Sequence, residues 1–203
     1  MTTIEYYLSL NSPWAYLGTA RLQAMTKAHG ATVVVKPARY GAIFEQTGGL
    51  PLPKRSPQRQ AYRLMELKRW RDHLGIPIVI QPKGFPSDEV AATRLVIAAA
   101  MQGRDALSFA RELGKNLWEL ERTLSEPADV AAAAQRAGLD LAVVRAAALP
   151  DTELDKIWEK NTADGLTRGV FGAPAYVLES GEFFWGQDRL EFLERALKKI
   201  RPA

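Results

Sequence analysis

The chain has 203 residues and carries 27 Lys and Arg against 23 Asp and Glu, for a formal net charge of +4. With 47% apolar and 25% charged residues, it has the composition of a globular protein, which excludes disorder, collagen and coiled coil for the whole chain. No stretch approaches the roughly 20 uninterrupted apolar residues of a membrane helix, and the N-terminal residues carry Glu5 but no basic residue, unlike a secretory signal. We therefore expect a cytoplasmic protein with no membrane partner.

The sequence contains no cysteine. This excludes disulfides, thiolate metal sites and thiol chemistry carried by the protein itself. Imidazole could come only from His29 and His73, and both are expected in the last turn of a helix, where the helix dipole favours a histidine. We therefore expect no metal site and no Ser-His-Asp triad.

The N-terminal part of the sequence predicts a β-α-β unit. Ile4–Ser9 alternates and is rich in β-formers, so it is expected to be a strand. Ser12 suits the cap of the following helix and Pro13 its first position, and Trp14–His29 has helical spacing of its apolar residues. Ala31–Lys36 is expected to be a buried strand, parallel to the first through a right-handed crossover.

The middle of the chain, from about Arg39 to Gly165, is expected to be almost entirely helical. Its apolar residues recur at helical spacing, and glycine or proline follows most of the periodic segments. The expected helices are Ser56–Leu74, Ser87–Met101, Arg104–Arg122, Pro127–Ala137, Asp140–Ala148 and Asp151–Gly165, with Ser87 and Asp140 as caps.

One of these helices is strongly basic. Between positions 54 and 71 there is a single acidic residue, Glu66, among seven basic residues. The basic residues are Lys54, Arg55, Arg59, Arg63, Lys68, Arg69 and Arg71. A solvated helix face is the first interpretation, a small anionic ligand the second and nucleic acid the third. Because the segment lacks a recognised nucleic-acid motif, we expect no nucleic-acid partner.

β character returns near the C-terminus. Ala175–Glu179 and Glu182–Trp185 are expected to form a hairpin around a tight turn, and Gln187–Ile200 is an amphipathic helix. The order is then β-α-β, a helical insertion, and β-β-α. We predict a discontinuous α/β domain, residues 1–38 and 166–203, with a helical insertion at residues 39–165.

A β-α-β half followed by a β-β-α half is the arrangement of the thioredoxin fold. Two local features agree: a short turn into the first helix, Ser12 to Ala15, and a proline just before the third strand, Pro174. In thioredoxin-like proteins the turn carries Cys-x-x-Cys. Here Ser12 and Ala15 take both cysteine positions, so a dithiol oxidoreductase is excluded. The facing proline predicts a cis Ala173–Pro174 bond, an arrangement found in only about 5–6% of X–Pro bonds.

Three motifs carry a resemblance to a known family: SPWAYL at 12–17, GVFGAPAY at 169–176 and FWGQDRL at 184–190. The sequence resembles the bacterial 2-hydroxychromene-2-carboxylate isomerases. These belong with the kappa-class glutathione transferases in a DsbA-like branch of the thioredoxin superfamily. The resemblance spans the chain, including the helical insertion, and it implies glutathione as cofactor.

The resemblance implies that the hydroxyl of Ser12 donates a hydrogen bond to the thiolate of glutathione. A helix N-terminus stabilises an anion by about 0.3 to 1 kcal/mol at exposed sites, and its first N–H groups lack intrahelical partners. Helix capping alone would also explain a Ser before Pro, and the two roles are compatible. Ser12 is therefore the catalytic candidate.

The resemblance also implies a set of glutathione contacts. Ala173, before the cis Pro174, would pair its backbone with the cysteinyl part of glutathione, like an added strand. Asp188, next to Gln187, would receive the γ-glutamyl ammonium. Arg59 takes a position where the family often has a Lys that meets a ligand carboxylate. An ordinary helix cap would also explain Asp188, and a solvated helix residue Arg59.

Four aromatic residues could line a pocket for an aromatic substrate, although core or helix packing would explain each of them taken alone; they are Trp14, Tyr16, Tyr62 and Trp70. Trp14 is the best candidate because it lies beside Ser12 in the sequence. Two residues depart from the family pattern. Ser9 takes a position where these proteins often carry Asp, and Asn11 one where a small or apolar residue is common. We expect these departures to bear on the choice of substrate.

The first functional hypothesis is a glutathione-dependent isomerase that converts 2-hydroxychromene-2-carboxylate to trans-o-hydroxybenzylidenepyruvate in aromatic catabolism. Its substrate would be a small aromatic carboxylate, and glutathione would be regenerated. A kappa-like glutathione transferase or peroxidase, which consumes glutathione, is the second hypothesis. A non-catalytic glutathione-binding domain is the third. The resemblance further implies a homodimer.

Overall fold

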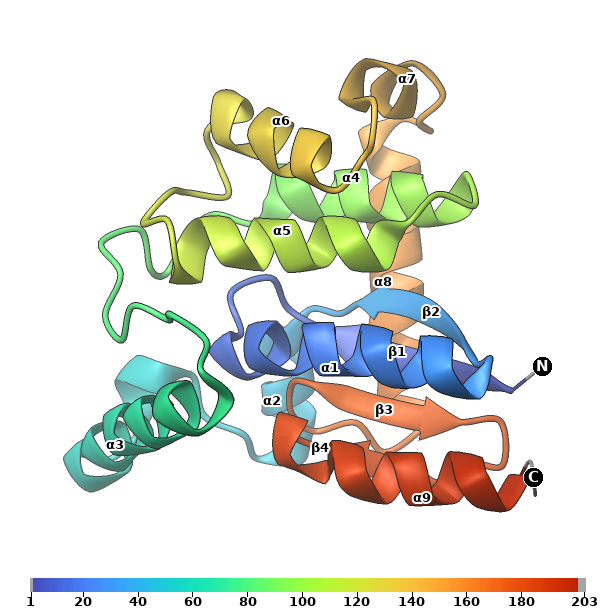
Figure 1. Ribbon diagram of the computed structural model, residues 1–203. Helices are drawn as coiled ribbons and strands as arrows, with labels where there is room; N and C mark the ends of the chain where they lie inside the picture. Colours follow the sequence, from blue (N-terminus) through green and yellow to red (C-terminus); the bar gives the residue numbers. More distant parts are fainter. Residues whose placement is uncertain (1, 201–203) are drawn as a thin grey trace.

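A four-stranded sheet lies at the centre of the computed structural model, which describes residues 2–200 (Figure 1). Its strand order is β2-β1-β3-β4. Strand β1 (Thr3–Leu8) pairs in parallel with β2 (Thr32–Pro37) and antiparallel with β3 (Ala175–Leu178), which forms an antiparallel hairpin with β4 (Phe183–Trp185). The predicted β-α-β unit and C-terminal hairpin are confirmed.

Both faces of the sheet are covered, because successive side chains of a strand point to opposite sides. On β1, Ile4, Tyr6 and Leu8 belong to a large hydrophobic cluster that includes residues of α1 (Pro13–His29) and α9 (Leu190–Ile200). The intervening Tyr7 joins a smaller cluster on the other face, with residues next to and within α2 (Tyr40–Thr47). Helices α1 and α9 lie side by side in front of the sheet in Figure 1.

Helix α1 begins and ends as its sequence predicts. The side chain of Ser12 accepts a hydrogen bond from the amide of Ala15 at 3.2 Å, and Pro13 holds the first position. Gly30 ends the helix in the left-handed conformation, with φ of 57°, which a residue without a side chain adopts at little cost. The helix therefore starts at a fixed point above the sheet.

The insertion between β2 and β3 is helical, as predicted. Besides α2 it contains a 3-10 turn at Leu52–Lys54, α3 (Pro57–Leu74), α4 (Val90–Met101), α5 (Ala106–Trp118), α6 (Pro127–Arg136), α7 (Leu141–Ala146) and α8 (Asp151–Thr167). Helix α5 packs against α1 and α6, α4 against β2 and α8, and α3 stands out to the left of the sheet in Figure 1.

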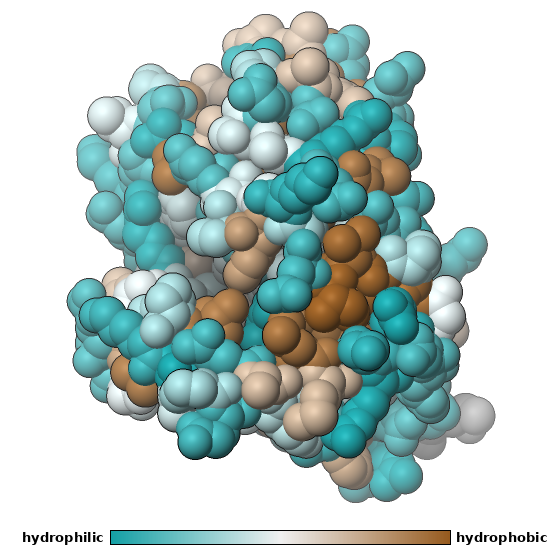
Figure 2. Space-filling model, turned by 90° about the vertical axis from the view of Figure 1, so that its left-hand side faces the viewer, coloured by the Kyte–Doolittle hydropathy of each residue, from teal (hydrophilic) through white to brown (hydrophobic). Residues whose placement is uncertain are grey.

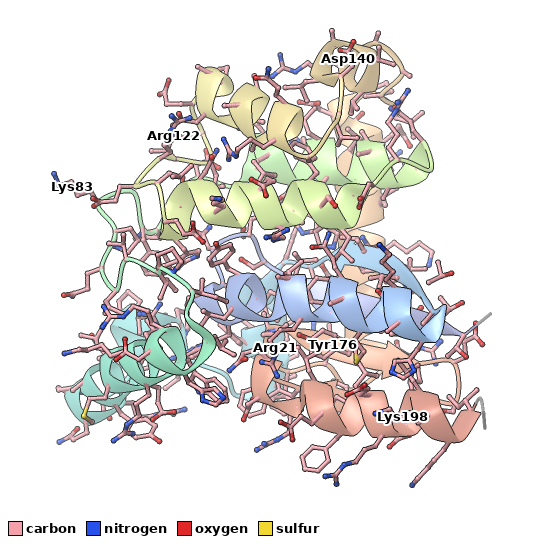
Figure 3. The ribbon with its side chains drawn as sticks, viewed as in Figure 1. Arg21, Lys83, Arg122, Asp140, Tyr176 and Lys198 are labelled. Atoms are coloured by element: carbon pink, nitrogen blue, oxygen red, sulfur yellow. The ribbon has the colours of Figure 1, made fainter. Side chains whose placement is uncertain are left out.

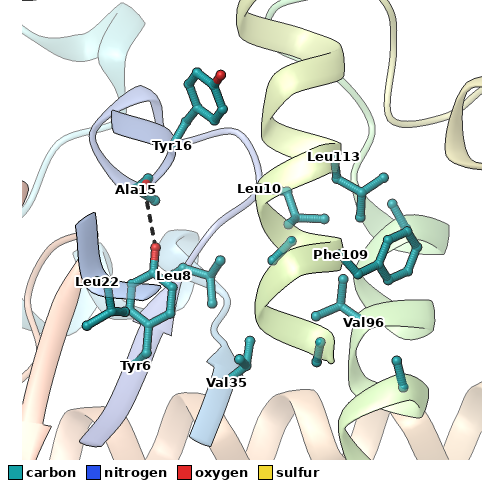
Figure 4. Close-up of a cluster of buried hydrophobic side chains, with 14 of the residues drawn as sticks. Tyr6, Leu8, Leu10, Ala15, Tyr16, Leu22, Val35, Val96, Phe109 and Leu113 are labelled. Atoms are coloured by element: carbon teal, nitrogen blue, oxygen red, sulfur yellow. Dashed lines mark hydrogen bonds between the residues drawn. The ribbon is translucent and has the colours of Figure 1, made fainter. Parts of the chain in front are cut away.

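The insertion shares its core with the sheet. Tyr6 and Leu8 of β1, Leu22 of α1, and Phe109 and Leu113 of α5 belong to one hydrophobic cluster (Figure 4). The hydroxyl of Tyr6 donates to the carbonyl of Ala15 at 3.4 Å, which ties β1 to the first turn of α1 within this cluster. The division into a thioredoxin-like domain and an insertion domain stays a prediction.

Three local predictions were wrong. Ser87 does not cap α4, which follows Glu89, because its side-chain oxygen accepts from the Leu124 amide at 2.8 Å and its backbone is paired with the side chain of Asn11. Helix α5 ends at Trp118, because the chain turns back and the amide of Arg122 donates to the carbonyl of Asn116 at 2.8 Å. The last helix does not begin at position 187; a 3-10 turn (Gln187–Arg189) precedes α9.

Two aspartates that the sequence offers as helix caps differ in what they do. Asp140 accepts from the amides of Ala142 and Val143 and caps α7 as expected. Asp188 makes no capping hydrogen bond at the 3-10 turn that contains it.

Over residues 2–200, no helix combines the length and the apolar character needed to cross a bilayer.

Candidate active site

A cavity of about 1370 Å³ opens at the N-terminal end of α1. It lies between α3 and the end of the sheet where β3 begins, and Figure 2 shows the face of the molecule from which α3 protrudes, with hydrophobic side chains surrounded by hydrophilic ones. Seven of the predicted site residues line it: Ser12, Trp14, Arg59, Tyr62, Ala173, Gln187 and Asp188. Pro174 is not among the lining residues, and Trp70 lines the cavity whereas Tyr16 does not.

The first turn of α1 presents two hydrogen-bond donors at the cavity. The oxygen of Ser12 accepts from the Ala15 amide, which leaves its hydroxyl proton free to donate elsewhere. Pro13 has no N–H. In this turn, the backbone N–H of Trp14 therefore remains without a hydrogen-bond partner among the residues described. A hydroxyl and an amide at the positive end of a helix favour an anion.

The turn before β3 presents backbone groups to the same cavity. The Ala173–Pro174 bond is cis, as predicted. Pro174 is buried, and its carbonyl accepts from the Gly186 amide at 2.9 Å. Ala173 lines the cavity, and its own N–H and C=O have no partner among residues 2–200. An extended ligand can therefore pair with Ala173 as with a strand edge.

The turn after β4 brings a carboxylate to the cavity. Asp188 has 38% of its side chain exposed and lies 3.1 Å from the guanidinium of Arg189. Gln187 is only 2% exposed, and its side-chain oxygen accepts from Arg21 of α1 at 2.7 Å. Figure 3 shows Arg21 between α1 and α9, and its guanidinium also donates to the Gln187 carbonyl at 3.2 Å, which ties α1 to the turn that precedes α9. The Gln187 side chain therefore holds the turn in place, and the Asp188 carboxylate remains available to a ligand.

Helix α3 and the residue before its cap contribute three arginines, Arg55, Arg59 and Arg63, to the cavity lining. Their four-residue spacing places them on one side of the segment, which is the signal that could have singled out Arg55 and Arg63. The other basic residues of the segment do not line the cavity; Arg69 pairs with Glu66 and Arg71 with Asp72.

The electrostatics of these arginines are unusual. Burial, and then the charge of Arg55, lowers the pKa of Arg63 to about 10. Burial, and then the charge of Arg59, lowers the pKa of Arg55. A guanidinium at neutral pH stays charged in both cases, so this wall of the cavity carries a positive potential.

Glu89, which the sequence did not single out, holds the turn that precedes Ser12. The Ser9 hydroxyl lies 2.9 and 3.0 Å from the two carboxylate oxygens of Glu89, and the backbone N–H of Asn11 donates to the same carboxylate at 3.0 Å. The Asn11 side chain donates to the Ser87 carbonyl and accepts from the Ser87 amide, each at 2.9 Å. The two departures from the family pattern, Ser9 and Asn11, thus attach this turn to the residues before α4.

The family follows from a comparison over nearly the whole chain. A family model described as the DSBA-like thioredoxin domain matches residues 3–198. The chain belongs to the DsbA-like thioredoxin family. The predicted fold is confirmed by this match and by the sheet topology.

Curated relatives of this DsbA-like protein carry two names. Glutathione S-transferase kappa 1 of Homo sapiens is 29% identical over 209 residues, which cover 96% of this chain and 90% of the relative. The 2-hydroxychromene-2-carboxylate isomerase of Sphingobium xenophagum is 24% identical over 198 residues, covering 96% and 97%. A solved 2-hydroxychromene-2-carboxylate isomerase structure has a TM-score of 0.78 at 22% identity, over 98% of this chain and 95% of that chain. The predicted resemblance is confirmed.

Proposed function

We propose that the protein is a glutathione-dependent isomerase of the 2-hydroxychromene-2-carboxylate isomerase type. The observation that carries the proposal is the first turn of α1, which presents the Ser12 hydroxyl and the Trp14 amide to the cavity in a chain without cysteine. A site that stabilises a thiolate but owns no sulfur needs a ligand that brings one.

The polar and charged groups that line the cavity fit the parts of glutathione. Ser12 and the Trp14 amide would face the sulfur, and the backbone of Ala173 would pair with the cysteinyl unit before the buried Pro174. The Asp188 carboxylate, held by the Gln187 turn, would receive the γ-glutamyl ammonium. Arg59, exposed on α3 and without an ion pair among the residues described, would meet a carboxylate.

Bound glutathione would supply a thiolate that adds reversibly to an unsaturated carbon of the substrate, so that the former double bond can rotate. The protein's part is binding and electrostatic. Ser12 and the N-terminus of α1 lower the free energy of the thiolate, Asp188 and Arg59 fix the tripeptide, and Trp14 and Tyr62 offer aromatic surface to a small aromatic carboxylate. Tyr62 is 54% exposed, which places it at the mouth of the cavity.

The relatives named glutathione S-transferase kappa support a second candidate, a kappa-like transferase or peroxidase. The two differ in what happens to glutathione. Incubation with 2-hydroxychromene-2-carboxylate should yield trans-o-hydroxybenzylidenepyruvate with the total of free glutathione unchanged, whereas a transferase would deplete it. If the protein binds glutathione but neither product forms, it is a non-catalytic binding domain and the proposal is wrong. A homodimer and a cytoplasmic location stay predictions.

A further inference from the structure

We propose that Arg63, assisted by Arg55, is the specificity-determining group that makes this cavity select aromatic co-substrates carrying an acidic group over neutral ones. The proposal rests on the proposed function only in placing the co-substrate in the same cavity as glutathione. It places the acidic group of the co-substrate on a part of the cavity wall away from the residues proposed to bind glutathione, which are Ser12, Ala173, Asp188 and Arg59.

The first observation is how Arg63 is held. Its guanidinium carbon lies 5.3 Å from the ring centroid of Phe85 and 5.8 Å from that of Trp118. Trp118 is fully buried and Phe85 packs on it at 5.0 Å, so the two rings form a rigid support. Cation–π contact fixes the guanidinium without consuming its N–H donors. Arg63 is therefore positioned in advance to bind an anion.

The second observation is the missing counter-charge. Among residues 2–200, no Asp or Glu forms an ion pair with Arg55, Arg59 or Arg63, and Glu66, which also lines the cavity, is engaged by Arg69. Arg55 uses its Nε to donate to the Leu50 carbonyl at 2.8 Å. A partly buried guanidinium without a carboxylate is unfavourable on its own. A ligand that brings an acidic group would remove that cost.

The third observation is the apolar surface beside this charge. Trp14, Trp70 and Phe85 line the cavity together with the arginines. A planar guanidinium binds a carboxylate through two parallel hydrogen bonds, and an adjacent ring can stack on the aromatic wall. The combination fits an aromatic or aryl-conjugated carboxylate.

The test measures binding and needs no turnover. Quenching of tryptophan fluorescence by trans-cinnamate and by its uncharged methyl ester would be compared at saturating glutathione. The wild type should bind the acid roughly 10- to 100-fold more tightly than the ester, the range of a hydrogen bond to a charged group. Arg63→Gln should remove most of that preference, leaving only what Arg55 supplies, and should leave the ester affinity within about twofold.

Two further variants keep the result interpretable. Arg63→Lys retains the charge without the planar fork, so it should retain part of the acid preference and show that Arg63→Gln did not act through misfolding. Arg59→Gln should weaken glutathione binding and leave the acid preference in place. If Arg63→Gln keeps the full preference, or if the wild type does not distinguish acid from ester, the proposal is wrong.

The outcome is independent of the proposed reaction. If 2-hydroxychromene-2-carboxylate is not isomerised but the acid preference depends on Arg63, the isomerase function fails and this inference stands. If the substrate is isomerised and Arg63→Gln favours the acid as strongly as the wild type does, the inference alone fails.

Discussion

The carboxylate of Asp188 occupies the space that a side chain on Gly186 would need. Gly186 has φ of 100°, a conformation that side-chain-bearing residues rarely adopt, and a Cβ built on it would collide with the Oδ1 of Asp188. The glycine thus allows the chain to turn after β4 with the acid folded back beside it. This backbone turn brings the carboxylate of Asp188 to the cavity.

Gly186→Ala should lower both stability and glutathione affinity. Forcing alanine into this backbone region costs about 1–3 kcal/mol, and the new methyl group would displace Asp188. Gly181→Ala is the matched control, because Gly181 also has positive φ, 86°, but open space around its Cβ. Urea unfolding should show a loss in both variants, and calorimetric titration with glutathione a loss in Gly186→Ala alone. Equal glutathione affinities in the two variants would argue against a role for Asp188.

We expect the thiol of bound glutathione to have a lower pKa than that of free glutathione. Ser12→Ala should raise this pKa, but only part of the way back to the free value. The hydroxyl is lost but the N-terminus of α1 and the Trp14 amide remain. Each unit of pKa depression corresponds to about 1.36 kcal/mol of preferential thiolate binding. Thiolate absorbance against pH, with each protein saturated with glutathione, measures the shift.

A capping control separates this effect from simple destabilisation. Loss of the Ser12 cap costs about 1 kcal/mol of stability. Asp140→Ala removes a comparable cap from α7, far from the cavity (Figure 3), and should cost stability without changing the thiolate titration. A Ser12→Ala protein that titrates and turns over like the wild type would reduce Ser12 to a helix cap.

Arg59→Ala should weaken glutathione binding by roughly 10- to 100-fold, as expected for loss of a hydrogen bond between charged groups. Lys68→Ala removes the same charge from an exposed position of α3 outside the cavity lining, and should leave the affinity almost unchanged. Calorimetric titration of both variants checks this. Equal losses of glutathione affinity in Arg59→Ala and Lys68→Ala would contradict a direct contact, because the loss of one positive charge anywhere on α3 would then explain the result.

Glu89 should make stability fall as pH rises. Burial raises the pKa of this carboxyl above its ordinary value of 4.5, and hydrogen bonds from Ser9 and Asn11 oppose the rise. Between the ordinary and the raised pKa the native state holds the proton more tightly than the unfolded state, so the unfolding free energy decreases with pH through that window. Above it the charged form remains a constant cost.

Glu89→Gln should flatten this component. The difference in unfolding free energy between wild type and variant, measured by urea titration from acidic to neutral pH, should decline with rising pH and then level off. The same variant should loosen the turn before Ser12, because a Gln amide can replace only part of the hydrogen bonding that Ser9 and Asn11 make. A pH-independent difference would mean that Glu89 ionises alike in the folded and unfolded chain.

Local signals gave the elements that position the site. Ser12 and Pro13 fixed the start of α1, Gly30 its end, and Pro174 marked the turn before β3, because caps and prolines act within a few residues. Ser87 failed as a cap because Leu124, distant in sequence, donates to its side-chain oxygen, while Asn11 pairs with its backbone. That pairing depends on tertiary contact, which no local pattern encodes.

The arginines illustrate the same limit. The basic segment was visible in the sequence, and Arg59 was singled out through the resemblance alone. That Arg63 faces the cavity depends on the packing of Phe85 against Trp118, which joins the loop before α4 to the end of α5. Glu89 likewise reaches Ser9 from a segment far along the chain. Side-chain chemistry was predictable, but its spatial neighbours were not.

The shared core has a consequence for how the molecule comes apart. Phe109 and Leu113 of the insertion lie in the same buried cluster as Tyr6 and Leu8 of the sheet, so neither part can lose its packing while the other keeps its own. Heating or denaturant should melt the inserted helices and the sheet in one cooperative transition. The insertion of one relative therefore cannot simply replace that of another. A chimaera would fold only if the cluster residues of its insertion and of its sheet came from the same protein.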